Sequence, residues 1–162
     1  MMFLAIGVVA LLQNPVDHPE YKGWASFKEG SSVTFTMVVD GKAQEGTMKV
    51  TLKSVGEKSV VVDEARNIKA MGPDRQAPRE IPATVAPGSI PKPEKEGDEE
   101  IQAAGKTLKC HWSEIRKSTA GGRIETVRYW VHDDVPGKMV QMRVTQPEGL
   151  TATLTAAEWE KK

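Results

Sequence analysis

Residues 108–113 read Leu-Lys-Cys-His-Trp-Ser, so apolar and polar side chains alternate with the period of a half-buried β-strand. A glycine pair at 121–122 predicts a two-residue turn, after which residues 124–133 return as the partner strand. Two further turns, at 136–137 and 147–149, combine a proline with a glycine. The C-terminal part of the chain therefore predicts four antiparallel strands joined by tight turns.

The length of the first turn decides which side chains share a face, because a slip of one residue inverts a whole strand. With a two-residue turn, the face of Cys110 and Trp112 collects apolar side chains from the next three strands: Tyr129, Val131, Val140, Met142, Val144, Ala152 and Leu154. The opposite face collects polar and aromatic side chains: His111, Arg128, Trp130, His132, Gln141, Arg143, Thr151, Thr153 and Thr155. We expect the first face to be the apolar face of the sheet.

The N-terminal half shows the same alternation. Phe35 and Met37 alternate with threonines, and a second alternating run begins at Met48. Residues 58–69 predict a third strand, and the one helix candidate covers about residues 19–28. We expect an all-β protein of about seven antiparallel strands, curled into a partly open barrel or a small sandwich, with one short N-terminal helix.

Six of the ten prolines lie within residues 72–98. Proline lacks the backbone N–H and clashes with a helical turn, so this stretch can form neither a helix nor a central strand. It ends in the mostly acidic run 94–100, which is typical of a solvated edge that discourages sheet extension. We therefore expect a single β domain over residues 15–162, with a proline-rich connector at 72–98.

Residues 3–12 form an uncharged apolar run that is too short to span a bilayer as a helix. Its length fits the apolar region of a secretory signal, although no lysine or arginine precedes it. The sequence thus predicts a signal peptide over residues 1–14 and an exported protein, periplasmic or extracellular. The alternative is that the run is a buried first strand or helix.

Composition excludes several functions. The chain has 162 residues, and 22 basic residues balance 22 acidic ones, so it has no positive excess for nucleic acid. A single cysteine excludes an intramolecular disulfide and an iron–sulfur cluster, and the apolar neighbours of Cys110 predict a buried, unreactive thiol. Phosphate-binding loops, dinucleotide fingerprints and nucleophile elbows do not occur. We expect a non-enzymatic protein without a cofactor.

A metal site is a weak candidate. In one register of the 121–122 hairpin, His111 and His132 lie opposite each other on the polar face, with Asp133 or Asp134 close by. A third ligand is not evident, because Asp133 points to the other face of a regular strand. The alternative is a plain solvated histidine pair.

The apolar face carries the main functional hypothesis, because flexible, polarizable methionines suit a surface that receives a lipid or another apolar small molecule. The residues of this hypothetical ligand-binding face are Phe35, Met37, Met48, Trp112, Tyr129, Met142 and Leu154. The alternative is that these side chains fill an ordinary core. In that case Arg128, Trp130 and Arg143, on the opposite face, would contact an envelope protein or a glycan.

Short patterns spaced along the chain resemble uncharacterised small secreted bacterial proteins. These patterns are Trp24-x-x-Phe27-x-x-Gly30-Ser31, Ile81-Pro82, Gly105-Lys106-x-x-x-Cys110-x-Trp112 and Trp130-x-x-x-x-Val135-Pro136-Gly137. More remotely, the strand order resembles the lipoprotein-carrier fold of LolA and LolB, an open curved sheet whose concave face shelters acyl chains. The resemblance implies an exported protein and, as an expectation, acyl-chain carriage. The carriers cap their sheet with helices, whereas the middle of this chain is proline-rich.

Overall fold

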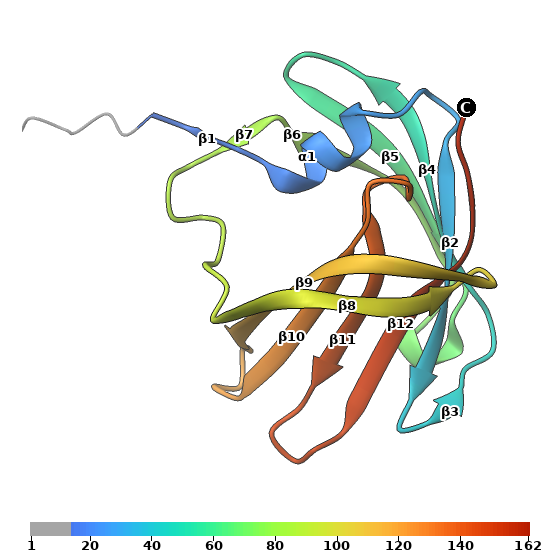
Figure 1. Cartoon of the computed structure of the whole chain (residues 1–162), viewed down its shortest axis with the longest axis vertical. Coiled ribbons are helices and arrows are strands. Elements are labelled where there is room, and N and C mark those ends of the chain that lie inside the picture. Colours follow the sequence, from blue (N-terminus) through green and yellow to red (C-terminus); the bar gives the residue numbers. More distant parts are fainter. Residues whose placement is uncertain (1–13) are drawn as a thin grey trace, which may run out of the picture.

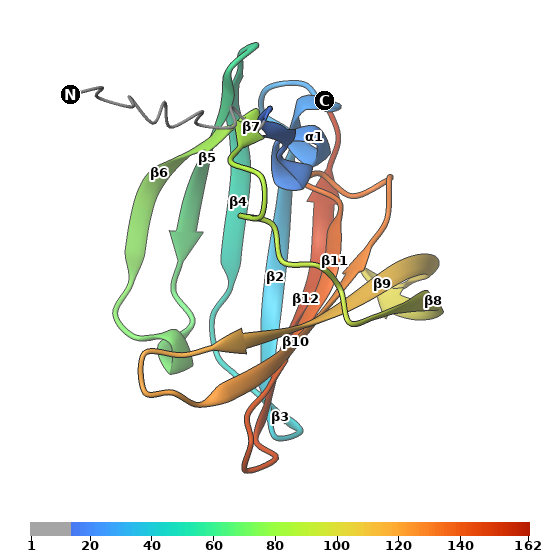
Figure 2. The same cartoon turned by 90° about the vertical axis from the view of Figure 1, so that its left-hand side faces the viewer.

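The computed structural model describes residues 14–162, so the predicted signal peptide, apart from its last residue, lies outside the described part. The described chain forms twelve strands, one α-helix and one 3-10 helix (Figures 1 and 2). The helices are α1 (Pro19–Ala25) and η1 (Lys69–Met71). The strands are β1 (Val16–Asp17), β2 (Ser32–Val39), β3 (Lys42–Ala43), β4 (Met48–Val55), β5 (Ser59–Arg66), β6 (Arg75–Pro82), β7 (Thr84–Val85), β8 (Lys95–Ala103), β9 (Lys106–Ser118), β10 (Ile124–Val131), β11 (Met139–Thr145) and β12 (Thr151–Glu160). The mainly-β expectation is confirmed, but twelve strands replace the expected seven.

One antiparallel sheet contains most of the strands. Its order is β6-β5-β4-β2-β12-β11-β10-β9-β8, with β3 paired to the end of β2, while β1 and β7 form a separate two-stranded ribbon. The sheet stays open, because β6 and β8 remain its two edges. It is nevertheless strongly curled, since β8 approaches β12 without being its partner (Figure 1). The partly open, curved architecture is therefore as expected.

Helix α1 lies on the inner side of the curved sheet, against β4, β5 and β6 (Figure 1). Pro19 is at its first position and His18 caps its N-terminus, because the Glu20 N–H donates to His18 Nδ1 at 3.2 Å. Arg79 of β6 then donates two hydrogen bonds to the Glu20 carboxylate, at 2.6 and 3.0 Å. The predicted helix is confirmed, although it ends at Ala25. Of the helices in residues 14–162, none is long and apolar enough to cross a membrane.

The proline-rich stretch is more than a connector. Residues 75–82 form β6, which pairs with β5 along its whole length, so the expected connector is wrong for this part. Pro78 and Pro82 are tolerated because β6 is an edge strand, whose outer side needs no hydrogen-bond donors. The stretch forms no helix and no central strand, as expected. Residues 95–100 of the acidic run lie within β8, which is the opposite edge of the sheet.

The turn between β9 and β10 is one residue longer than predicted. Ser118 pairs with Ile124, and the Thr119 N–H donates to the Arg123 carbonyl at 2.8 Å. Three residues therefore make the turn, 120–122, instead of the glycine pair alone. Because side chains alternate along a strand, this single residue inverts β9 relative to β10.

The inversion changes the partners of β9 and leaves those of the later strands as predicted. Trp112 is the cross-strand partner of Trp130, so the two indoles share a face instead of lying on opposite faces. Beyond β10 the register is confirmed, because Tyr129 faces Met142 and Met142 faces Leu154. Within this block the prediction therefore fails at that turn and at the end of β10, where a register shift pairs Val131 with Met139.

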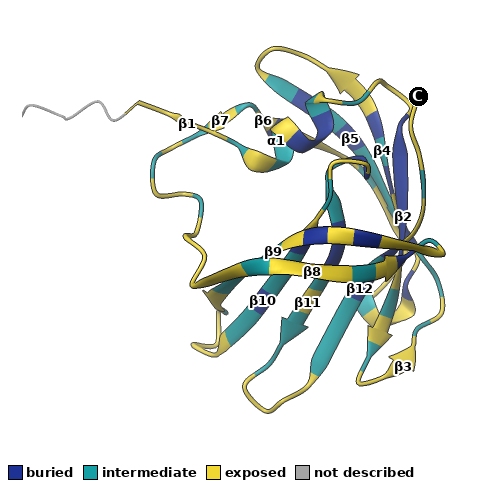
Figure 3. Ribbon diagram, viewed as in Figure 1, coloured by how far each residue is buried: buried dark blue, intermediate teal, exposed yellow. Residues whose placement is uncertain are grey.

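Buried residues recur along the strands of the curled sheet (Figure 3), and they belong to both of its faces. Phe35 and Leu154 are buried on the face that α1 covers, and Trp130 and Gln141 are buried on the other. Trp130 is 1% exposed, although the sequence placed it on a polar, solvated face. The curl of β8 and β9 toward β12 explains how this second face is shielded from solvent.

Candidate functional site

Three neighbouring strands place a row of charged side chains on one face of the sheet. Glu114 of β9 is the partner of Arg128 of β10, and Arg128 is the partner of Arg143 of β11. The adjacent row on the same face pairs Trp112 with Trp130. We call these five residues the arginine–tryptophan face. It contains all three residues of the predicted interaction face.

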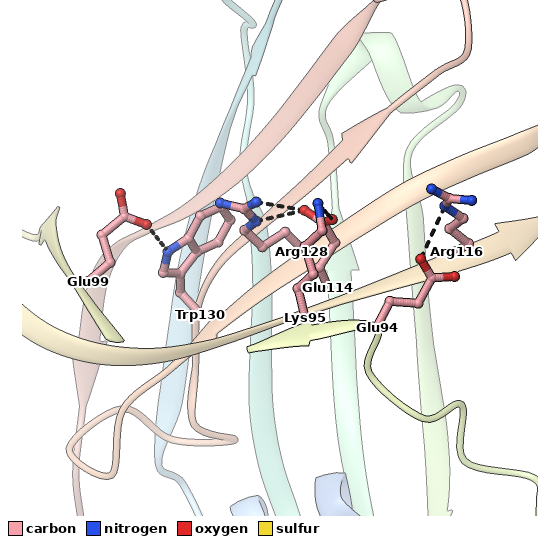
Figure 4. A network of polar contacts seen from close by, with 7 residues as sticks. All are labelled: Glu94, Lys95, Glu99, Glu114, Arg116, Arg128 and Trp130. Atoms are coloured by element: carbon pink, nitrogen blue, oxygen red, sulfur yellow. Dashed lines mark hydrogen bonds and ion pairs between the residues drawn. The ribbon is translucent and has the colours of Figure 1, made fainter. Parts of the chain in front are cut away.

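Arg128 lies between Glu114 and Trp130 on the arginine–tryptophan face (Figure 4). Its Nε and Nη2 donate to Glu114 Oε2 at 3.0 and 2.6 Å, and its guanidinium lies 4.1 Å from the centroid of the Trp112 ring. Lys95 Nζ lies 3.7 Å from the other oxygen of Glu114. The hydrogen bonds from Arg128 hold the pKa of Glu114 below its ordinary value. The charge of Arg128 is thus already neutralised.

Trp130 supports this face from below, because its side chain is buried. Its Nε1 donates to Glu99 Oε2 at 2.8 Å (Figure 4), and the guanidinium of Arg143 lies 5.3 Å from its ring centroid. Because Trp130 is buried, the structure does not support the prediction that Trp130 itself contacts a partner. Its indole instead positions the cation that lies over it.

Trp112 is likewise held within the protein. Gly97 of β8 is its cross-strand partner, and a Cβ at Gly97 would lie 2.9 Å from the indole. The ring therefore packs against the backbone of β8, while Arg128 lies over it. An indole packed in this way offers little free ring surface for stacking on a sugar.

A small recess of about 120 Å³ opens between the charged side chains. Its lining residues are Glu114, Thr126, Arg128, Arg143 and Thr145. Within residues 14–162, Arg143 has no carboxylate within 4.0 Å, whereas Arg128 is paired with Glu114. The recess therefore offers one uncompensated positive charge and two hydroxyl groups, which suits an anionic group.

The sequence alone missed Glu114, Thr126 and Thr145. The signal was present, because Glu114 follows Trp112 by two residues and so shares its face. With the correct turn length, Glu114 would have been placed opposite Arg128, an opposite-charge pair that favours this register.

Six of the seven residues of the predicted ligand-binding face do share one face. Tyr129, Met142, Leu154 and Met37 follow one another across four strands, and Phe35 is the partner of Met48. Tyr129, Met37 and Met142 are partly exposed, whereas the other three are buried. Trp112 is the exception, because it lies on the opposite face.

The environment of Tyr129 is apolar and close to α1. Burial raises the pKa of its hydroxyl, and the negative charge of Glu20 raises it further. Neither the 120 Å³ recess nor a second one of about 310 Å³ is lined by the methionines of this face. The assignment of these residues to ligand binding stays a prediction.

The histidines and the cysteine form no common site. His111 faces Val131 and lies 3.2 Å from Asp98, while His132 accepts a hydrogen bond from the Asp134 N–H, so the predicted opposition of the two histidines is wrong. Throughout the described part, three or more potential ligands nowhere gather as a metal site would need. The Cys110 thiol is 1% exposed, and burial raises its pKa.

The fold defines a curled, open antiparallel sheet with one helix on its inner side. No protein-family model and no curated protein sequence matches the chain. A solved structure with a YmcC-like fold, a presumed exported protein of Bacteroides fragilis, is similar with a TM-score of 0.55 and 10% identity. The match covers 83% of this chain and 97% of the other. This likeness establishes the fold alone, and the likeness to the lipoprotein carriers stays a prediction.

Proposed function

We propose that this chain is an exported, non-catalytic binding module, and that its arginine–tryptophan face takes an acidic group of a partner protein. The observation that carries this proposal is the guanidinium of Arg143, which has no carboxylate partner among the described residues although it lines a recess. A partner carboxylate there would form a charge-assisted hydrogen bond. Thr126 and Thr145 add neutral donors at the same place.

An acidic protein group suits this face better than a glycan. Sugars are bound largely by stacking on free aromatic rings, but Trp112 packs against Gly97 and Arg128, and Trp130 is buried. The remaining exposed chemistry is cationic. Arg143 is held over Trp130, so a partner carboxylate meets a guanidinium whose orientation is already limited.

Export is supported by the apolar run at residues 3–12 and by the likeness to the presumed exported protein of Bacteroides fragilis. The test is fractionation of a bacterial host that expresses the full chain or a chain lacking residues 1–14. We expect only the full chain to leave the cytoplasm. Equal cytoplasmic retention of both would contradict export.

The binding proposal is tested with fluorescein-labelled hexaglutamate, whose anisotropy reports binding. We expect saturable binding that weakens as salt is added, since exposed charges are screened. Arg143→Gln should weaken binding by about fivefold or more, because it removes the uncompensated charge. The control is Arg123→Gln, which removes a guanidinium that is already paired with Glu148 at 3.2 Å. Equal losses in both variants, or no binding to the wild type, would contradict the proposal.

A second candidate is an amphiphilic ligand on the opposite, methionine-bearing face. It is favoured by the partly exposed side chains of Tyr129, Met142 and Met37 on β10, β11 and β2. Native mass spectrometry with palmitate or a lysophospholipid tests it. We expect Met37→Gln with Met142→Gln to lose the bound mass, whereas Val38→Gln, on a neighbouring residue that is 38% exposed, should keep it. A wild-type chain that stays bare with both lipids would exclude this candidate.

A further inference from the structure

One border of the methionine-bearing face carries two arginines instead of apolar side chains. Phe35 of β2 is the cross-strand partner of Met48 of β4. Met48 in turn is the partner of Arg66 of β5, and Arg66 is the partner of Arg75 of β6. Because cross-strand partners project from the same face of a sheet, both arginines share the face of Phe35 and Met48. We call Arg66 and Arg75 the arginine pair.

The arginine pair lies beside a long apolar row. The pair is at the end of β5 and the start of β6, beside η1 and away from α1 (Figure 2). On the same face, Met37 follows Phe35 by two residues, and its row continues through Leu154 and Met142 to Tyr129. Five steps between neighbouring strands, each of about 4.8 Å, separate β5 from β10, so this face offers about 24 Å along the sheet. That length suits an extended chain better than a compact group.

The charge of the arginine pair is not neutralised. In residues 14–162, no carboxylate lies within 4.0 Å of either guanidinium. Glu64 lies on the same face, two residues before Arg66, but its carboxylate is 3.8 Å from Arg79 Nε. Asp74 precedes Arg75 and forms no ion pair with it within 4.0 Å. Two positive charges therefore stand at the border of an apolar surface.

Two features of the arginine pair are unfavourable in the free protein. Like charges in directly opposed positions of two strands repel each other, and Arg66 and Arg75 are such a pair. The Nε of Arg66 is also buried and finds no hydrogen-bond acceptor within the described chain. A buried donor without an acceptor costs free energy. An anionic group bound at the arginine pair supplies an acceptor and reduces the repulsion.

We propose that the arginine pair binds the carboxylate of a fatty acid whose apolar chain lies along the methionine-bearing face. A carboxylate is small and planar, and it matches the paired N–H donors of a guanidinium. The apolar chain would contact the partly exposed Met37 and Met142. This inference rests on the second candidate function and adds the charge of the ligand, because a neutral amphiphile would leave both arginines unpaired.

Calorimetric titration at constant ionic strength tests this site with three probes. Decanoate carries the charge and the chain, decan-1-ol carries the same chain without the charge, and hexanoate carries the charge on a shorter chain. We expect decanoate to bind about fivefold or more tightly than decan-1-ol, because only decanoate pairs with the arginines. We expect hexanoate to bind about tenfold or more weakly than decanoate, because four methylene groups no longer leave water.

Variants show whether the carboxylate binds at the arginine pair. Arg75→Gln, at an exposed residue, and Arg66→Gln should each weaken decanoate binding by about fivefold or more and leave the affinity for decan-1-ol unchanged. A merely structural role of these arginines would weaken the binding of both probes alike. Lys49→Gln is the matched control. Lys49 is exposed at the same end of the sheet, but its partner Ala65 places it on the opposite face.

The outcomes separate this inference from the function on which it rests. No saturable binding of decanoate or decan-1-ol up to their solubility limits would contradict both. Equal affinities for decanoate and decan-1-ol would overturn the role of the arginine pair and leave the second candidate function standing. Equal losses of decanoate affinity in Lys49→Gln and Arg75→Gln would also overturn that role. Loss of decanoate binding in Arg143→Gln would move the carboxylate to the arginine–tryptophan face, against the proposal.

Discussion

At the scale of single residues, Glu114 holds the arginine–tryptophan face together. It neutralises Arg128, fixes that guanidinium over Trp112, and lies within 3.7 Å of Lys95. Its side chain is only 14% exposed, so its two hydrogen bonds are poorly screened by water. Glu114 is therefore the residue whose loss should most disturb this face without touching Arg143.

Glu114→Gln should lower the free energy of unfolding by about 1 kcal/mol at neutral pH, since it weakens charge-assisted hydrogen bonds. Folding lowers the pKa of this carboxyl from 4.5, so its stabilisation is present above that pH. The stabilisation is lost as the pH falls through the folded-state pKa. Between neutral pH and about pH 3, the free energy of unfolding measured with urea should therefore fall less in the variant than in the wild type. Glu125→Gln, on β10, is the control. An identical fall of the free energy of unfolding on acidification in all three proteins would contradict the role of Glu114.

Gly137 is required for a different reason, because its turn packs closely against a side chain. Its φ is +74°, and a Cβ there would lie 2.6 Å from the ring of Trp24. Gly149 has a similar φ of +91°, but no atom lies within 4 Å of the position of its Cβ. The two glycines therefore share the backbone conformation and differ in the space around it.

Gly149→Ala should cost about 1 kcal/mol, from the positive φ alone. Gly137→Ala should cost at least about 2 kcal/mol more, because the methyl group also collides with the buried indole of Trp24. Urea denaturation followed by tryptophan fluorescence measures both. Equal costs for the two variants would show that the turn moves away from Trp24 without penalty.

At the scale of elements, the alternation of apolar and polar residues predicted most of the strands. The wrong length for one turn, between β9 and β10, placed the side chains of β9 on the wrong face. The order and register of β10, β11 and β12 follow from sequence, because their turns carry unambiguous proline and glycine signals. The turn at 119–123 contains Gly121 and Gly122, which fit a two-residue turn as well as a longer one. That ambiguity of one residue separated Trp112 from Arg128 and hid the arginine–tryptophan face.

Other elements lay beyond what local patterns can show. Strand β6 was missed because proline disfavours strands in general, whereas an open edge tolerates it. The pairing of β2 with β12 joins residues such as Met37 and Leu154, far apart in the sequence. No local sequence pattern in either strand identifies the strand with which it pairs.

Deleting Ala120 tests the importance of the turn between β9 and β10. The deletion leaves two turn residues and favours the register that separates Trp112 from Trp130, which conflicts with burial of Trp130 and Cys110. We expect a loss of about 3 kcal/mol or more, or failure to fold. Deleting Ser89, in the link between β7 and β8, should cost far less, since loops tolerate changes of length. Similar stability of the two deletion variants by urea denaturation would contradict the register.

At the scale of the whole molecule, the curl of the sheet gives each face its own character. The face under α1 carries Tyr129 and the methionines, and the other face carries the paired and unpaired arginines. The likeness to the Bacteroides fragilis protein extends over most of both chains and concerns the fold alone. Binding at the two faces can therefore be tested separately.

Tyr129 links the first face to α1 and should make stability sensitive to alkaline pH. Burial and the charge of Glu20 raise its pKa above 10.0 in the folded protein. The neutral hydroxyl therefore contributes stability below pH 10, and this contribution is lost as the pH rises through the folded-state pKa. Tyr129→Phe should flatten the loss of stability above pH 10 in urea denaturation. An unchanged alkaline slope would show that Tyr129 ionises alike in both states.

The most direct measurement of the binding account uses the indole N–H signals of the four tryptophans in a ¹⁵N-resolved spectrum. Hexaglutamate is titrated into the wild type and into Arg143→Gln. The account predicts that the signals of Trp112 and Trp130 shift in the wild type, that Trp24 stays unchanged, and that Arg143→Gln abolishes the shifts. A titration that leaves Trp112 and Trp130 unchanged, or shifts them equally in Arg143→Gln, would contradict it.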